Sequence, residues 1–326
     1  MNLTTTYLGM TLPHPLIVGA AGALTDDLDS VKQLEDAGAA ALVLRSLYED
    51  DTTGEQMSSY FQSDSHSGSS AEADTYFPDP LLAGGPDEYT EHLQRVKAAV
   101  SIPVIASLNG VTAGGWTTYA RLLEQAGANA IELNLYHSAS DATLTAAQVE
   151  AQMIQIVRDV KQKVSIPVAA KLSTRFTAFA NFAIQLDAAG TDGFVLFHRL
   201  HNVDIDVLEY DILRSLSLSD SSALQVGLRG VAVLAGRVNA SLAITGGVHT
   251  ALDVLKATMT GAHVCQLVSA LIANGPGHIG KLLKGVNEWM AENDWASLEE
   301  MRGNMSFHRV PDPGAYEREA FRRMFR

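Results

Sequence analysis

Two stretches decide the fold: Ala243-Ile244-Thr245-Gly246-Gly247-Val248 and Val264-Cys265-Gln266-Leu267-Val268-Ser269-Ala270. Each begins as an apolar run typical of a buried strand and then passes into sequence with helical character. The first run stops at paired glycines, which let the backbone approach a ligand closely and direct N–H groups at it. The second stops at Ser269, where a predicted helix start leaves N–H groups free. Together the two ends predict an anion site, and a phosphate fits it best.

Six further runs of the same kind precede these two. The eight predicted strands are 16–18, 41–44, 104–108, 131–135, 168–172, 194–197, 242–245 and 264–268. A helical stretch follows each strand, which predicts a parallel sheet with right-handed crossovers. An open doubly wound α/β sheet is one arrangement of such units. The phosphate-like ends of the last two strands favour the closed (β/α)8 TIM barrel, because that fold commonly holds phosphate there.

An internal repeat supports the regular alternation of strands and helices. Residues 100–108 recur as residues 164–172, and residues 125–133 resemble residues 187–195. The spacing fits two β/α units, and an Ala-Gly or similar pair ends each helix before the next buried strand.

Local signals place the other elements. Residues 2–12 predict a short N-terminal cap, with a hairpin as one form of it, that closes the bottom of the barrel. Thr25 or Asp26 is expected to cap a helix that stops at Gly38. Thr145 and Gln148 have the spacing of a capping box. Further helices are expected at about 88–100, 279–291 and 297–302.

We expect one domain spanning residues 1–326, with a lid insertion at 49–87 after the second strand and a C-terminal tail at 303–326. The insertion is rich in Ser, Asp, Gly and Thr and contains Tyr60-Phe61 and Tyr76-Phe77. It is too long for an ordinary βα loop. Its aromatic residues favour a partly ordered lid over the barrel mouth, and a flexible surface insert is the alternative.

Composition excludes several classes of protein. The chain has 326 residues, of which 47% are hydrophobic, and a formal net charge of −14. Because no basic run is present, we expect neither nucleic acid nor an anionic membrane surface as a partner. The N-terminus has no signal-peptide pattern, and the single Cys265 lies in an apolar strand as a buried, inert thiol. These features fit a cytoplasmic protein. No metal site is expected.

Catalytic residues of such barrels lie at the C-terminal ends of the strands. Lys171 is the most telling, because it follows small and apolar residues and a buried lysine is costly unless it meets an anion or an electron-rich cofactor. Asn109 and Asn134 have side chains that could read a ligand's amide edges, although Asn also caps helices. His137 has the chemistry of a general base, and a loop histidine is the alternative. Arg199 could grip an anion or form a rim salt bridge.

The chain resembles the dihydroorotate dehydrogenase family, nearest its soluble, usually homodimeric branch. The matching motifs run nearly end to end: Ala20-Ala21-Gly22, Arg45-Ser46, Glu132-Leu133-Asn134-Leu135, Val168-Ala169-Ala170-Lys171-Leu172, Gly227-Leu228-Arg229-Gly230 before the sixth helix, Thr245-Gly246-Gly247 and Gly261 to Leu271 followed by Gly275-Pro276. Each motif is weak alone, but their order and spacing together are specific.

The resemblance implies an FMN cofactor. Its phosphate would lie on Gly246-Gly247 and Val268-Ser269, and Lys171 would face the electron-accepting edge of the ring, where a cation stabilises the anionic reduced flavin. The cofactor-binding residues implied are Ala20, Gly22, Ser46, Asn109, Asn134, Lys171, Gly230, Gly246, Gly247, Val268 and Ser269. The catalytic residues implied are His137 and Lys171, and the substrate-binding residues are Arg45, Asn134 and Arg199.

The chain departs from the family's pattern in its substrate half. His137 stands where the family has a cysteine or serine base, and Ala139 stands where a substrate-reading asparagine is expected. The family lysine after the second strand is Arg45, and a second expected asparagine aligns with Arg199. No asparagine occurs between Asn2 and Asn109, although the family's lid supplies one.

We therefore expect a flavin-dependent oxidoreductase of dihydroorotate dehydrogenase-like type, acting on CH–CH groups, with an altered substrate half-site, an unassigned electron acceptor and a homodimeric state. The first alternative is a genuine dihydroorotate dehydrogenase that oxidises dihydroorotate to orotate in pyrimidine biosynthesis. The second is a flavin-free barrel lyase or isomerase that binds a phosphorylated substrate and uses Lys171 as a base or Schiff-base former. The third is a flavin-binding partner subunit without turnover.

Overall fold

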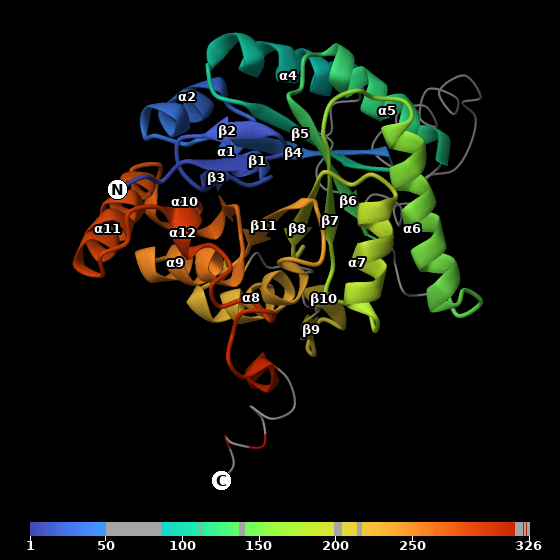
Figure 1. Cartoon of the computed structure of the whole chain (residues 1–326). Coiled ribbons are helices and arrows are strands. Elements are labelled where there is room, and N and C mark those ends of the chain that lie inside the picture. The colour runs from blue at the N-terminus through green and yellow to red at the C-terminus, as the bar shows by residue number, and fades with distance from the viewer. Residues whose placement is uncertain are drawn as a thin grey trace, which may run out of the picture.

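The computed structural model describes residues 1–49, 86–110, 113–136, 141–198, 204–213 and 217–316, and residues 322 and 324. Its centre is a closed barrel of parallel strands, with helices on its outside (Figure 1). The eight predicted strands and the (β/α)8 TIM barrel are confirmed. In barrel order the strands are β3 (Leu16–Val18), β4 (Leu42–Tyr48), β5 (Val104–Asn109), β6 (Ala130–Leu135), β7 (Val168–Leu172), β8 (Gly193–Leu196), β11 (Ser241–Thr245) and β12 (Val264–Leu267).

Helices alternate with these strands along the described chain. They are α1 (Gly22–Thr25), α2 (Leu28–Asp36), α4 (Pro86–Ala99), α5 (Ala113–Gln125), α6 (Ala146–Lys161), α7 (Phe179–Ala188), α8 (Leu224–Leu234), α9 (Ala251–Thr260), α10 (Ser269–Asn274), α11 (His278–Glu292) and α12 (Leu298–Met301). The capping box that starts α6 is confirmed, because Thr145 and Gln148 exchange hydrogen bonds. Gly38 follows α2 with a φ of +92°, as expected of a residue just past a helix end.

Three local predictions are wrong. The side chain that caps α2 is Asp27, whose Oδ2 accepts from the Ser30 N–H at 2.8 Å, and not Thr25 or Asp26. The second strand continues to Tyr48, so Arg45 and Ser46 lie within it; its register against β5 shifts between Val43 and Ser46. The Gly227 to Gly230 motif lies inside α8 and not before it, because the helix already begins at Leu224.

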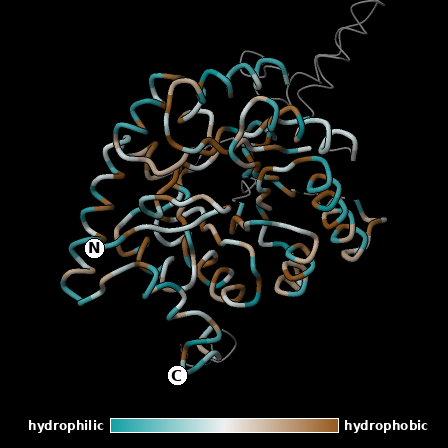
Figure 2. The backbone as a smooth tube through the Cα atoms, turned by 45° about the horizontal axis from the view of Figure 1, so that its top comes forward, coloured by the Kyte–Doolittle hydropathy of each residue, from teal (hydrophilic) through white to brown (hydrophobic). Residues whose placement is uncertain are grey.

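Alternation along the strands sorts side chains into two apolar layers. Ile131, Leu133 and Leu135 of β6 pack outward in the large core between barrel and helices. Ala130 of the same strand belongs to the smaller core inside the barrel, with Ile17, Val43, Ile105, Ala169, Val195, Ala243 and Val264. Figure 2 shows the hydrophobic segments of the backbone gathered at the central strands, while the surrounding helices alternate between hydrophobic and hydrophilic.

The predicted N-terminal cap is a hairpin of β1 (Thr5–Tyr7) and β2 (Met10–Leu12). Tyr7, Leu8 and Leu12 are fully or almost fully buried and join the core inside the barrel. The hairpin therefore closes the bottom of the barrel and leaves the opposite, C-terminal ends of the strands as the place for a ligand site.

Two further segments lie outside the barrel. A second hairpin, β9 (Asp204–Asp206) and β10 (Asp211–Leu213), was not predicted; it exposes Leu208 by 82% and Tyr210 by 93%. The first part of the predicted tail packs on the body, since the Gly303 N–H donates to the Thr258 carbonyl and the Phe307 N–H to the Ala232 carbonyl, both at 3.0 Å. The predicted lid falls almost wholly outside the described residues.

Candidate active site at the barrel mouth

A cavity of about 410 Å³ opens at the C-terminal ends of the barrel strands. Seven of the predicted site residues line it: Ala20, Gly22, Lys171, Gly246, Gly247, Val268 and Ser269. They come from β3, β7, β11 and β12 or the turns after them, so the fold brings together residues that are far apart in the sequence. The cavity has the size of ordinary small-ligand sites.

The glycine pair forms one end of this cavity. Gly246 and Gly247 have φ values of +83° and +81°, a conformation that other residues adopt only with strain. A Cβ on Gly246 would meet no atom within 4 Å, whereas a Cβ on Gly247 would lie 2.2 Å from the backbone nitrogen of Leu224. Gly246 thus leaves room for a ligand, and Gly247 lets the start of α8 pack against the turn.

A polar cluster that sequence reasoning missed surrounds the glycine pair. The Gly247 N–H donates to Ser219 Oγ at 3.3 Å, and Ser219 Oγ lies 3.4 Å from His249 Nε2. The Ser219 N–H in turn donates to Ser269 Oγ at 3.1 Å. These hydroxyl and imidazole groups line the cavity together with the glycines.

Asp253, the third residue of α9, holds the turn that carries His249. Its Oδ2 accepts hydrogen bonds from the backbone N–H groups of His249 and Thr250 and from Ser221 Oγ, at 3.1, 2.9 and 2.6 Å. Burial by itself raises the pKa of the Asp253 carboxyl, but these hydrogen bonds outweigh it and lower the pKa below its usual value. The capping-box spacing of Thr250 and Asp253 is the sequence signal for this arrangement.

Lys171 lines the cavity and is 8% exposed. Its Nζ donates to Glu132 Oε1 at 3.0 Å, and Gln266 Nε2 donates to Glu132 Oε2 at 2.6 Å. Glu132 therefore supplies, within the barrel, the anion that Lys171 needs. The sequence predicted no role for Glu132. Alternation along β6 and β12 predicts that Glu132 and Gln266 point inward, but not that they meet.

Two buried amide oxygens near Lys171 have no hydrogen-bond partner: Asn134 Oδ1 and Gln266 Oε1. Asn134 is 3% exposed and lies beside Lys171 in the register of β6 and β7. An unpaired buried acceptor costs about 1–3 kcal/mol, and Gln266 lines the cavity, so Gln266 Oε1 is placed to accept from a ligand that carries N–H or O–H donors.

Five of the predicted site residues that the structure describes do not line the mouth cavity: Arg45, Ser46, Asn109, Asn134 and Gly230. Arg45 Nε donates to Asp26 Oδ1 at 2.9 Å, and its guanidinium lies 5.5 Å from the Tyr89 ring centroid, so Arg45 already has an anionic and an aromatic neighbour. Ser46 Oγ lies 2.7 Å from Ser107 Oγ. Asn109 and Asn134 are on inward-facing positions of β5 and β6 but are not part of the cavity lining.

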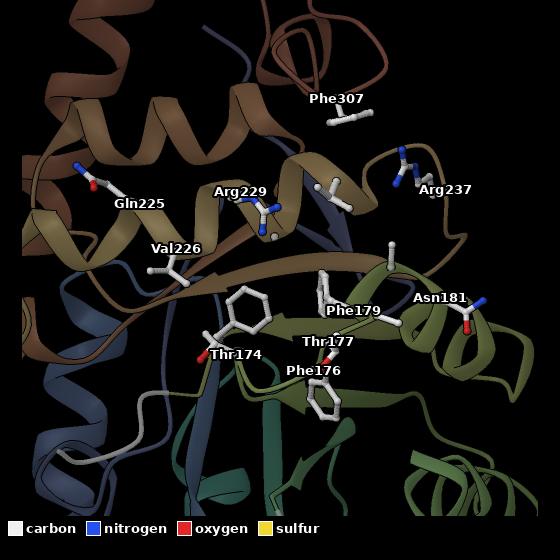
Figure 3. Close-up of a pocket in the computed structure, with 15 residues that line it drawn as sticks. Thr174, Phe176, Thr177, Phe179, Asn181, Gln225, Val226, Arg229, Arg237 and Phe307 are labelled. Atoms are coloured by element: carbon white, nitrogen blue, oxygen red, sulfur yellow. The ribbon is translucent and has the colours of Figure 1, made fainter. Parts of the chain in front are cut away.

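Gly230 lies on α8 and lines a second cavity of about 580 Å³ outside the barrel, not the mouth cavity. Figure 3 shows this second cavity, with Val226 and Arg229 projecting from α8 and Phe179 and Asn181 coming from α7. Phe197 lines both cavities, and a Cβ on Gly230 would lie 2.5 Å from its ring. Gly230 therefore makes room for the aromatic wall between the two cavities.

His137 and Arg199 lie outside the described residues, as does almost all of the 49–87 segment. Their roles as base and substrate ligand stay predictions. Cys265 is buried as predicted, and burial raises the pKa of its thiol. No helix in the described part of the chain is long and apolar enough to cross a membrane.

Comparison with known proteins places this site in a family. The family model for dihydroorotate dehydrogenase matches residues 2–290. A protein of Aeropyrum pernix with the provisional name dihydroorotate dehydrogenase A (fumarate) is 31% identical over 223 residues, which cover 66% of this chain and 72% of the relative. The dihydroorotate dehydrogenase B (NAD(+)) catalytic subunits of Thermoplasma acidophilum and Thermoplasma volcanium are 25% and 26% identical, each covering 93% of this chain and 98% of the relative.

The family match spans the barrel and every part of the mouth cavity, from Ala20 to Ile272. The predicted resemblance and the predicted enzyme class are confirmed. This chain belongs to the dihydroorotate dehydrogenase family and is a flavin-dependent oxidoreductase.

Proposed function

We propose that this protein is an FMN-dependent oxidoreductase that keeps the cofactor half of a dihydroorotate dehydrogenase site and has a changed substrate half. The observation that carries the proposal is the mouth cavity, in which Gly246, Gly247 and Ser269 share one space with Lys171. The backbone N–H groups of the glycine turn suit a phosphate, and the Lys171 ammonium suits a ring that becomes negative on reduction.

The residues present fit FMN. The open space at the Gly246 Cβ position lets a phosphate approach the backbone. Two groups that line the cavity suit a flavin ring: the unpaired Gln266 Oε1 can accept a hydrogen bond and the Lys171 ammonium can donate one, which matches the mixed donors and acceptors of the ring. When bound, FMN supplies two-electron redox chemistry. Lys171 then stabilises negative charge at the ring, and His137 takes or returns the proton of the substrate.

FMN content tests the cofactor assignment. The purified protein should be yellow and release about one FMN per chain, since one cavity combines the glycine pair and Lys171. Colourless protein that takes up no added FMN would refute it. Lys171 donates to the Glu132 carboxylate, an arrangement that suits an ammonium and not the neutral amine of a Schiff-base lyase.

The altered substrate half rests on sequence differences. Ala139, Arg45 and Arg199 replace residues with which the family reads its substrate, and Arg45 is paired with Asp26. Dihydroorotate presents amide edges and one carboxylate, and each buried polar edge left unmet costs about 1–3 kcal/mol. Two lost contacts would weaken transition-state binding by about 2–6 kcal/mol, or roughly thirty-fold to more than ten-thousand-fold in kcat/KM.

A genuine dihydroorotate dehydrogenase is the second candidate, because the relatives carry that name. Anaerobic mixing of the yellow protein with millimolar dihydroorotate separates the two. Bleaching of the flavin absorbance within about a second would show that the site reads dihydroorotate and would replace the proposal of an altered half-site. Slow or absent bleaching is the expected result.

We propose a homodimer, in line with the soluble branch that the chain resembles, and a cytoplasmic location, in line with the single buried cysteine. The electron acceptor is not assigned. Two relatives are named as catalytic subunits, so a second subunit that transfers electrons is a candidate partner of this protein. Light scattering of the purified protein should give twice the chain mass; a monomer would contradict the homodimer.

A further inference from the structure

A buried carboxylate stands directly behind the cation of the mouth cavity. Glu132 is 1% exposed, and its two oxygens accept from Lys171 Nζ at 3.0 Å and from Gln266 Nε2 at 2.6 Å. Lys171 and Gln266 line the cavity, whereas Glu132 does not. Any effect of Glu132 on a ligand in the cavity therefore passes through these two neighbours or through its charge.

The apolar surroundings of Glu132 strengthen the electrostatic effect of its charge. Ala130, one inward position below it on β6, belongs to the apolar core inside the barrel, which Tyr7 and Leu12 close from beneath. The hydroxyl of Tyr7 is buried without a hydrogen-bond partner. Burial, and to a smaller extent the nearby charge of Glu132, raises the pKa of this hydroxyl well above its usual value. Charges interact more strongly in such a dry environment than in water.

The geometry gives Glu132 two consequences for Lys171. First, the bond from Gln266 fixes one carboxylate oxygen, so the other stays aimed at the Lys171 ammonium. Second, the negative charge offsets part of the positive field that the ammonium projects into the cavity. An unpaired lysine ammonium would strongly stabilise a negatively charged ring in the cavity, whereas an ammonium bound to a carboxylate stabilises that charge less.

We propose that Glu132 is a positioning residue that sets the reduction potential of the flavin by holding Lys171 and offsetting its charge. This inference rests on the proposed function, because it requires FMN in the mouth cavity. Two-electron reduction of the flavin takes up two electrons and one proton and leaves one negative charge on the ring. The Lys171–Glu132 pair decides how strongly the protein stabilises that charge.

The decisive variant is Glu132→Gln, which keeps the shape and removes the charge. Gln266 can turn its amide so that its unpaired Oε1 accepts from the new amide group, and Lys171 can direct its ammonium into the cavity, so folding is expected. Glu132→Asp keeps the charge on a shorter side chain. Glu292→Gln removes an exposed carboxylate at the end of α11 and controls for net charge.

The measurement is the two-electron reduction potential of bound FMN, obtained anaerobically with xanthine and xanthine oxidase as the electron source and a reference dye. Glu132→Gln should favour the reduced flavin at least tenfold over the parent, a rise of about 30 mV. Glu132→Asp should shift the potential in the same direction by less, and Glu292→Gln should match the parent.

If Glu132→Gln favours the reduced flavin less than tenfold over the parent, the inference is overturned, while bound FMN leaves the proposed function intact. If Glu132→Gln does not fold, a Glu132→Asp potential equal to that of the parent overturns it instead. A purely structural role for Glu132 would lower thermal stability in both variants without moving the potential. A parent protein without FMN defeats the proposed function itself, and the inference with it.

Discussion

The glycine pair offers a matched test of how the cofactor end of the cavity is built. Gly246 and Gly247 have almost the same backbone conformation, with φ of +83° and +81°, but different surroundings. An added Cβ meets no atom within 4 Å at Gly246 and lies 2.2 Å from Leu224 N, 2.7 Å from Leu224 Cα and 2.8 Å from Ala223 C at Gly247. We therefore predict different effects for the same substitution, Gly→Ala, at neighbouring positions.

The expected magnitudes follow from these contacts. Each alanine pays for a left-handed conformation with about 1–2 kcal/mol of folding free energy. At Gly247 the backbone at the start of α8 must also move, and such overpacking adds about 1–3 kcal/mol. Gly246→Ala should therefore lose about 1–2 kcal/mol of stability and Gly247→Ala about 2–5 kcal/mol in total.

Urea unfolding of the FMN-free proteins measures the stability difference, and fluorescence titration measures FMN affinity. Gly246→Val should abolish FMN binding, because its side chain grows from a position where a Cβ meets no protein atom within 4 Å. Equal stability losses for the two alanine variants would refute the packing argument. Tight FMN binding by Gly246→Val would refute the placement of the phosphate on the glycine pair.

Three further predictions test other parts of the molecule. Burial, with a contribution from the Arg302 charge, lowers the pKa of His263 to about 4, and its Nδ1 accepts from the Leu242 N–H at 3.0 Å. Between pH 7 and pH 5 the His263 imidazole takes up a proton in the unfolded chain but not in the folded protein, so the free energy of unfolding should fall by about 1–2 kcal/mol over that range. His263→Asn keeps a hydrogen-bond acceptor and should remove this fall, as measured by urea unfolding at a series of pH values. Gly230→Val should push the Phe197 ring toward the mouth cavity and weaken FMN binding roughly tenfold or more, as measured by fluorescence titration. An unchanged FMN affinity would show that the Phe197 ring moves in another direction. His137→Ala should leave the flavin spectrum intact but slow its reduction by a substrate that turns over by about 10²–10⁴-fold in stopped flow, and a parent-like rate would move the role of base to Ser138 or Tyr136.

The barrel, its strands and the family were predictable because they depend on local patterns. Apolar runs such as 168–172 bury on both faces in a parallel sheet, and the paired glycines mark a turn that must approach something closely. The positions of Lys171, Gly246 and Ser269 follow from the rule that strand ends gather at one mouth of the barrel.

The local patterns also misled at a few points. The pattern predicts Arg45 after the second strand, but the strand continues through a register shift, and Arg45 pairs with Asp26 and lies over the Tyr89 ring. Gly230 reads as a loop glycine of the cofactor site, but it lies within a helix and accommodates the Phe197 ring. In both cases the spacing was right, and the orientation depended on neighbours distant in sequence.

The sequence by itself determined the closed barrel, its polar mouth and the glycine end of the cavity, since strand periodicity, turn residues and strand order set them. Only the tertiary structure decided which inward side chains meet. Glu132, Lys171 and Gln266 come from three strands, and Ser219 and His249 from two separate turns. Strand alternation predicts that Glu132, Lys171 and Gln266 point inward, but their heights and distances depend on the stagger of the strands around the closed barrel, which pairs residues far apart in the chain.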